Sequence, residues 1–246
     1  MDRMLYVAMT GAKNTMLAQD INNNNLANIN TTGFRADLAS FQSVPVMGSG
    51  YPSRINAIVS GTNVDLAAGP LISTGRDLDV AVKGDGLIAV QAPDGNEAYT
   101  RAGDLQVNSA GMLTTAAGYP VIGNSGPIAI PPNEKLEIGA DGTISIQPTG
   151  QTPNTLAVLD RIKLVKIPSD PLIKTSEGLL QTVGGDTLAA EGSATLQSGV
   201  IESSNVNGIE VLTNMIELSR HYDVQIKLLK TAEDNDAAGA QLLRLA

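Results

Sequence analysis

Apolar side chains recur at alternating intervals of three and four residues at both ends of this 246-residue chain. Within residues 1–35 the stripe is formed by Leu5, Met9, Ala12, Met16 and Leu26. This spacing places the side chains on one side of an α-helix, and such a helix must cover its apolar stripe with another surface. The sequence therefore predicts a long N-terminal helix over residues 1–33, with Gly33 ending it and Phe34 docking directly afterwards.

The second half of this stripe is polar, with Gln19 and Asn23 at the corresponding positions. Each residue of the run Asn22–Asn25 disfavours an isolated helix by about 0.6 kcal/mol relative to alanine. We therefore expect the segment to be poorly ordered alone and helical once packed. An asparagine at a core position also fixes helix register at a cost in stability, which suits a helix that must select its partner.

The last fifth of the chain carries the same pattern. Its stripe is formed by Leu212, Met215, Tyr222, Ile226 and Leu229. It is preceded by residue types that cap helix N-termini, namely Ser203, Ser204, Asn205 and Asn207. We predict one long helix within residues 199–246, lying beside the N-terminal helix as an antiparallel or hairpin-like, coiled-coil-like pair.

Between the helices the sequence predicts two further regions. Residues 34–76 contain frequent glycine and proline, which indicates an extended connector with short strand pieces such as 55–59. Its apolar residues, including Leu38 and Phe41, favour an ordered arm against neighbouring subunits over a free linker.

Residues 77–198 read as many short β-strands. The turns Pro93–Asn96 and Gly139–Gly142 each lie between two strand-like runs and predict hairpins. Residues 161–167 alternate polar with apolar side chains and predict one half-buried strand. Short strands need a second layer or closure to protect their edges, so we expect a mainly β domain of sandwich or barrel-like form.

Charge and composition exclude several classes of function. The net charge is −9, and no run of lysine or arginine occurs, which argues against nucleic acid and anionic membranes as partners. The absence of cysteine excludes disulfides and thiolate catalysis. No apolar stretch reaches about 18 residues, and Asp2 argues against a cleaved secretory signal. We expect a chain that is not inserted in a membrane.

Residues of catalytic type are sparse. His221 is the sole histidine, lies on a predicted helix and has no nearby nucleophile motif. Asp77, Asp79 and Asp85 lack the spacing of a calcium loop, and we place Asp77 and Asp79 on the solvent face of a strand. A carboxylate pair for glycoside hydrolysis depends on separation in space and stays open. We expect no catalytic residue, metal site, cofactor or small-molecule substrate.

Three blocks in order carry a resemblance. Residues 1–9 and 24–35 read MDRMLYVAM and NNLANINTTGFR, residues 78–104 include LDVAVKGDGLIAV and YTRAGD, and residues 199–206 read GVIESSNV. Together they make the chain similar to the bacterial flagellar axial proteins, and most of all to the subunits of the basal-body rod. Arg35 stands where lysine is commoner in that family, and Leu87 where many members carry an aromatic residue.

The resemblance implies a structural subunit of the proximal rod, the shaft that transmits torque to the hook. It implies assembly with copies of itself and other rod subunits, and delivery to the periplasm by the flagellar type III export apparatus without a cleaved signal. The residues expected at subunit interfaces are Leu5, Met9, Ala12, Met16, Leu26, Asn28, Gly33, Phe34, Leu212, Met215, Tyr222, Ile226 and Leu229. The alternatives are a distal rod or hook subunit and, from another class, a peptidoglycan-directed hydrolase or binding module.

Overall fold

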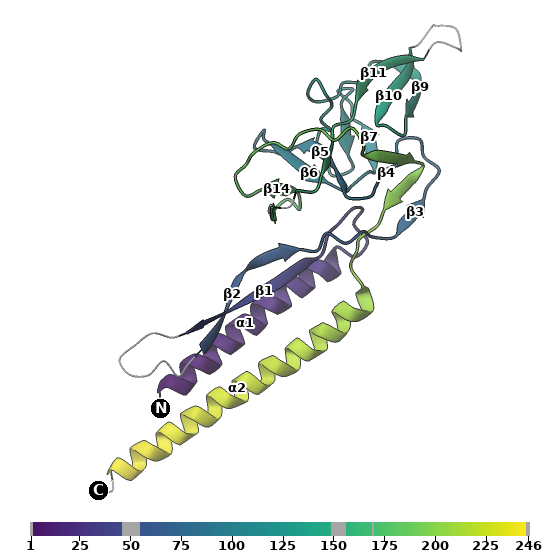
Figure 1. Ribbon diagram of the computed structural model, residues 1–246. Coiled ribbons are helices and arrows are strands. Elements are labelled where there is room, and N and C mark those ends of the chain that lie inside the picture. The colour runs from purple at the N-terminus through teal and green to yellow at the C-terminus, as the bar shows by residue number, and fades with distance from the viewer. Residues whose placement is uncertain (1, 46–54, 149–155, 169, 245–246) are drawn as a thin grey trace. The chain divides into compact units, whose positions relative to one another are not determined.

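The chain is mostly β, with one helix near each end (Figure 1). The computed structural model describes the backbone of residues 2–45, 55–148, 156–168 and 170–244. The two helices are α1 (Asp2–Ala27) and α2 (Gly208–Arg244). The strands are β1 (Asp37–Pro45), β2 (Ile55–Val64), β3 (Leu71–Ser73), β4 (Val80–Lys83), β5 (Gly86–Gln91), β6 (Glu97–Thr100), β7 (Leu105–Val107), β8 (Leu113–Thr115), β9 (Asn133–Ile138), β10 (Thr143–Pro148), β11 (Ala157–Arg161), β12 (Leu164–Lys166), β13 (Leu172–Lys174), β14 (Leu180–Thr182), β15 (Thr195–Ser198) and β16 (Val200–Glu202).

The chain divides into two compact units, and neither is continuous in sequence. The helical unit consists of Met1–Ala27, Asp37–Asn63 and Asn207–Ala246. The β unit consists of Asn28–Ala36 and Val64–Val206. The segment predicted as a connector, residues 34–76, thus contributes to both units.

In the helical unit, α1 and α2 lie side by side and run antiparallel. The Asn22 side chain of α1 donates a hydrogen bond to the carbonyl of Val211, in the first turn of α2, at 2.8 Å. Further back along α1, a Cβ added at Gly11 would lie 2.9 Å from the side chain of Gln225. Contacts therefore move forward along α2 as they move backward along α1. A coiled-coil supertwist in the pair remains a prediction.

The stripe of α2 that is shielded within the chain differs from the predicted one. Its buried and half-buried positions are Gly208, Val211, Met215, Leu218, Tyr222, Gln225, Leu229 and Ala232, again at intervals of three and four. Leu212 and Ile226, which we placed on the stripe, are 50% and 43% exposed. This helix carries more than one apolar stripe. At alternate positions, the shielded residue lies one position before the predicted one.

On α1 the same displacement occurs. Met9 and Met16 are 55% and 52% exposed, whereas the small residues Ala8 and Ala12 are buried. Small side chains allow two helix backbones to approach closely, and the larger methionines lie outside this contact. Asn22 and Asn25 are buried while Asn23 is exposed, so the polar half of the stripe is also displaced.

The end of α1 was predicted wrongly. The helix ends at Ala27, and residues 28–33 form turns instead, with the Thr31 N–H donating to the Asn28 carbonyl at 3.1 Å. The Asn25 side chain exchanges two hydrogen bonds with the backbone of Asp37, both 2.8 Å long. The helix ends early for two reasons. This amide contact holds the chain beside α1, and the asparagine and threonine residues that follow Ala27 are weak helix formers.

The first part of the predicted connector is a two-stranded sheet, β1–β2, rather than short strand pieces. Strand β1 contacts α1, so this sheet belongs to the helical unit. Leu38 and Phe41 on β1 are exposed. Their contact with neighbouring subunits remains a prediction.

The β unit is built from open sheets in the part of the chain that the structure describes. The largest has the strand order β12-β5-β6-β14-β13, and a second has the order β11-β10-β9. The predicted hairpins are confirmed as β5–β6 and β9–β10, both antiparallel. None of the sheets formed by the described residues closes on itself, so the barrel-like alternative is wrong.

Strand β5 separates two apolar clusters. Ile88 and Val90 pack into the larger cluster, whereas Leu87 and Ala89 pack into the smaller one on the opposite face. Successive side chains of a strand point to opposite faces, so the central sheet is buried on both sides.

The single strand predicted at residues 161–167 is two strands. Arg161 ends β11 and pairs with Thr143 of the three-stranded sheet, whereas Leu164 begins β12 and pairs with Ile88 of the five-stranded sheet. The chain leaves one sheet and enters the other between these residues.

Asp79 was predicted to face solvent, but its side chain is buried. The backbone of Asp79 forms an isolated antiparallel β-bridge with the backbone of Asp104. The Oδ1 atom of Asp79 lies 3.6 Å from Nη1 of Arg76. Burial raises the pKa of Asp104, and the charge of Asp79 adds to this effect. A negative charge on Asp104 is therefore disfavoured in the folded state.

We predict that Asp104→Asn raises the Tm at pH 7. An acid whose pKa is raised by folding makes its full contribution to stability when the pH is below its unfolded pKa, about 3.9. This contribution is lost as the pH rises through the folded pKa. The gain from the substitution should therefore shrink as the pH falls towards about 4. Thermal unfolding across this pH range measures it, and an equal gain at every pH would contradict the assignment.

We predict that Asn22→Ala weakens the helix pair. Loss of the hydrogen bond to Val211 costs about 1 kcal/mol, and the amides in the first turn of α2 should then exchange faster with solvent. Asn23→Ala is the matched control, since it changes the adjacent, exposed asparagine and improves helix propensity by about 0.6 kcal/mol. Equal exchange rates in the two variants would show that the Asn22 contact does not hold the helices together.

Candidate functional site

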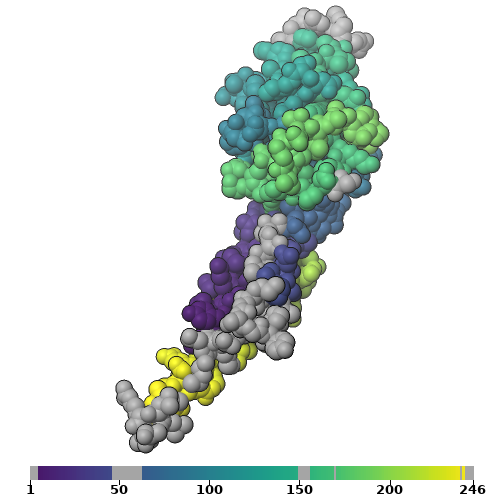
Figure 2. All heavy atoms as spheres, turned by 60° about the vertical axis from the view of Figure 1, so that its left-hand side comes forward, coloured from purple at the N-terminus to yellow at the C-terminus, as the bar shows by residue number. Residues whose placement is uncertain are grey.

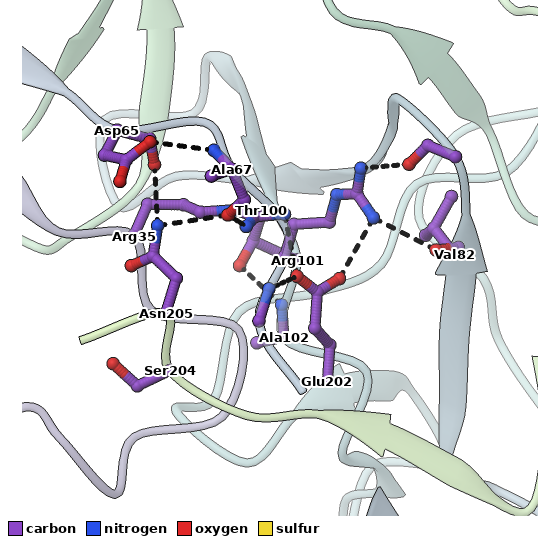
Figure 3. A network of polar contacts seen from close by, with 12 residues as sticks. Arg35, Asp65, Ala67, Val82, Thr100, Arg101, Ala102, Glu202, Ser204 and Asn205 are labelled. Atoms are coloured by element: carbon purple, nitrogen blue, oxygen red, sulfur yellow. Dashed lines mark hydrogen bonds and ion pairs between the residues drawn. The ribbon is translucent and has the colours of Figure 1, made fainter. Parts of the chain in front are cut away.

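A buried carboxylate bridges two arginines in the β unit. Glu202, the last residue of β16, is 2% exposed. Its Oε1 lies 2.8 Å from Nη2 of Arg35, and its Oε2 lies 3.0 Å from Nη1 of Arg101 (Figure 3). Both arginine side chains are also buried. We call Arg35, Arg101 and Glu202 the ion triad.

Each member of the triad comes from a different part of the chain. Arg35 lies between α1 and β1, Arg101 directly follows β6, and Glu202 ends β16. The β5–β6 hairpin positions Arg101, while pairing of β16 with β3 positions Glu202. The triad therefore joins segments that are remote in sequence.

Backbone carbonyl groups hold the two guanidinium groups in place. Arg101 donates to the carbonyl of Val82 at 3.0 Å and to that of Gly84. Arg35 donates to the carbonyl of Ala67. The Glu202 carboxylate also accepts a hydrogen bond from the N–H of Gly69 at 2.9 Å.

The electrostatics of the triad are a balance of burial and pairing. Burial lowers the pKa of both Arg35 and Arg101, while the charge of Glu202 opposes this effect. Arginine stays protonated in proteins, so the two cations share one paired carboxylate and the triad keeps a net positive charge. Removal of one partner of a buried ion pair destabilises the fold by far more than the intact pair stabilises it, because an uncompensated charge remains.

A second set of hydrogen bonds surrounds the triad. The Asn205 Oδ1 accepts from the N–H of Ala36 at 2.7 Å, and its Nδ2 donates to the carbonyls of Asp65 and Ala67, each at 3.0 Å. Figure 3 shows Asn205 beside Arg35, Asp65 and Ala67. This amide links the segment after α1 to the segment before β3.

Gly33 is required here by a close backbone approach and not by the end of a helix. Its φ is +66°, and its N–H donates to the carbonyl of Glu202 at 2.7 Å. A Cβ at this position would lie 2.2 Å from the backbone nitrogen of Ala102. Our assignment of Gly33 as the helix C-cap is therefore wrong.

Phe34 docks within the β unit. Its side chain is half-buried, and Nζ of Lys174 lies 3.6 Å from the centre of its ring. Lys174 also donates to the carbonyl of Arg35 at 2.8 Å. A cation over an aromatic face is attractive, and this contact fixes the chain next to the triad.

The structure places the predicted interface residues in two groups. Those shielded within the chain, fully or in part, are Leu5, Ala12, Leu26, Asn28, Gly33, Phe34, Met215, Tyr222 and Leu229. Those exposed are Met9, Met16, Leu212 and Ile226. Tyr6, Ile209 and Ile216 are exposed on the same two helices, and Figure 2 shows part of α1 in purple on the molecular surface.

The helical unit also contains a groove of about 750 Å³. Its walls include Leu5 of α1 and, on α2, Ile226, Leu229 and Ala240. Three of the predicted interface residues thus line one concave surface.

Within the described ranges, no three histidine, cysteine, aspartate or glutamate side chains are grouped closely enough to hold a metal ion. His221 is exposed on α2. None of the described helices combines the length and the apolar character that crossing a bilayer requires.

Sequence reasoning missed the roles of Arg101 and Glu202, and it gave Asn205 the role of a helix cap in place of its contacts with Ala36, Asp65 and Ala67. A signal was present in β16. Val200 and Glu202 are two positions apart, so they lie on the same face of the strand, and both are buried. A charged residue at a buried position of a strand requires an ion-pair partner. The partners themselves could not be identified, since they lie far away in the sequence.

Three family models match the chain in succession. Residues 5–35 match the model described as flagella basal body rod protein, residues 81–146 match the flagellar hook protein FlgE/F/G D1 domain, and residues 197–242 match the flagellar basal body rod FlgEFG protein C-terminal model. Each matched region contains one member of the triad: Arg35, Arg101 and Glu202 respectively.

Whole-length relatives agree with these matches. The chain is 40% identical to the flagellar basal-body rod protein FlgF of Salmonella typhimurium and 39% identical to that of Escherichia coli, in both cases over all of this chain and all of the relative. It is 34% identical to the flagellar basal-body rod protein FlgG of Buchnera aphidicola, over 93% of this chain and 95% of the relative.

We predict that Gly33→Ala destabilises the β unit more than Gly75→Ala does. Both glycines have a positive φ, +66° and +70°, but a Cβ at Gly75 would meet no atom within 4 Å. Gly75→Ala should cost about 1–2 kcal/mol for the left-handed backbone alone. Gly33→Ala must also displace the backbone at Ala102, and equal Tm values for the two variants would contradict this close approach.

Proposed function

The chain belongs to the flagellar basal-body rod protein family and is a structural subunit of the rod, and we propose that it assembles through apolar surface left exposed on α1 and α2. The observation that carries this proposal is the exposure of Met9, Met16, Leu212 and Ile226. These residues lie at heptad spacing and outside the shielded stripe of the helix pair.

Burial of such side chains supplies the driving force for assembly. A large apolar side chain contributes about 1.5–3 kcal/mol when it is moved from water into a packed interface. Contiguous exposed apolar surface on a protein is typical of an interaction site. The groove beside Leu5, Ile226 and Leu229 extends this surface and would receive side chains from a neighbouring subunit.

The two helices carry different exposed residues, and we propose that exposed surface of α1 contacts exposed surface of α2 in a neighbouring subunit. Contacts between unlike surfaces build helical tubes where the rotation does not close into a ring. A shaft built in this way transmits torque through packed helices. We propose this role for both terminal helices of the chain.

We place the subunit in the proximal rod, with other rod subunits and copies of itself as partners. The 40% identity to FlgF of Salmonella typhimurium extends over the whole of both chains and exceeds the 34% identity to FlgG of Buchnera aphidicola, and this difference supports a position in the proximal rod. The resemblance further implies export by the flagellar type III apparatus without a cleaved signal, and a periplasmic site of assembly. The relatives are named as rod proteins, and our proposal assigns the chain no catalytic activity.

We predict that Leu212→Glu abolishes incorporation into basal bodies while the isolated chain stays folded. Leu212 is exposed, so the Tm of the monomer should change by no more than the equivalent of about 0.5 kcal/mol. Asn214→Glu, a change at a nearby exposed position of α2, is the control and should assemble. Motility and the amount of the chain in purified basal bodies measure the effect. Normal assembly of Leu212→Glu would rule out this surface as an interface.

A further inference from the structure

We propose that the ion triad couples the docking of two remote segments, so that residues 28–36 and residues 199–206 attach to the β unit together and detach together. Glu202 is the residue through which the coupling acts. The inference rests on contacts within the β unit and does not depend on how the rod is assembled.

The first step is the shared charge. Among the described residues, Glu202 is the one acid that forms ion pairs with both Arg35 and Arg101. The negative charge of Asp65 interacts electrostatically with Arg35 alone, and that of Asp85 interacts with Arg101 alone. Withdrawal of Glu202 therefore leaves two buried guanidinium groups without their common counter-ion.

The second step is that Glu202 contacts the N-terminal segment through its backbone as well. Its carbonyl accepts the N–H of Gly33, and its Oε1 accepts the N–H of Gly69. When residues 199–206 detach, Gly33 and Arg35 lose their contacts with Glu202 at the same moment. Detachment of residues 28–36 in turn removes one of the two cations that neutralise Glu202.

The third step is the parallel contact made by Asn205. Its side chain bonds the backbone of Ala36, and also that of Asp65 and Ala67. The same two segments are thus joined at a second point. Because the segments are joined at two separate points, detachment of one segment alone is costly. The segment that detaches leaves buried polar groups of the other without partners.

The consequence concerns the two places where the chain enters the helices. Residues 28–36 directly follow α1, and residues 199–206 lie just before α2. Both attachment points therefore share one buried joint.

Hydrogen exchange on the isolated full-length chain tests the proposal. Glu202→Gln keeps the shape of the side chain and removes its charge. We expect exchange to accelerate by at least about 100-fold in residues 28–36 and in 199–206, because the loss of one partner of a buried ion pair corresponds to a factor of this size or more. The two segments should accelerate by the same factor.

Glu97→Gln is the matched control. It removes the carboxylate of another ion pair in the β unit, Lys163–Glu97, which is 2.7 Å long and partly buried. Faster exchange in this variant should stay near β6 and residue 163. Acceleration of residues 28–36 in the control would show general destabilisation of the unit and overturn the proposal.

Arg35→Met provides the reciprocal measurement and leaves the pair between Glu202 and Arg101 intact, so it serves even where Glu202→Gln does not fold. We expect faster exchange in residues 199–206, although the substitution lies in the other segment. Acceleration confined to residues 28–36 would mean that the segments detach independently, and the proposal would be wrong.

Discussion

The β unit depends on a charge that cannot be left unpaired. Glu202, Arg35 and Arg101 are all removed from water, and the desolvation of three ions is a large cost that their mutual attraction only offsets. The triad is therefore a weak source of net stability and a strong constraint on conformation. Any arrangement that separates the three side chains leaves an ion in an apolar interior, so Gly33, Gly69 and the end of β16 are held in one geometry.

The helical unit follows a different rule, because its apolar residues are divided between an inner and an outer surface. Small residues such as Ala8 and Ala12 are buried, and the larger Met9 and Met16 remain exposed. A finished globular protein would place the larger side chains inside, where each buries more area. In the assembly that we propose, neighbouring subunits would cover these larger side chains.

Local chemistry decided how much of this could be predicted. The hairpin turns Pro93–Asn96 and Gly139–Gly142 were correct because turn residues specify their backbone within a few positions. Both helices were found, but heptad spacing alone could not choose between adjacent apolar stripes, and Leu212 lies outside the stripe that is shielded within the chain. Gly33 was recognised as a special position for the wrong reason, since the backbone of Ala102 that excludes a side chain is far away in sequence. The triad was missed for the same reason: periodicity carries no information on which distant residues meet.

The discontinuous β unit also sets the order in which the chain can fold during synthesis. Strands β15 and β16 pair with β4 and β3, and Asn205 reaches back over 169 residues to Ala36. A ribosome delivers the chain from its N-terminus, so Arg35 and Arg101 emerge long before the carboxylate with which both form ion pairs. Pairing between such remote segments is slow, because a long loop must close before any contact forms. The nascent chain thus stays incompletely folded until nearly all of it has been made.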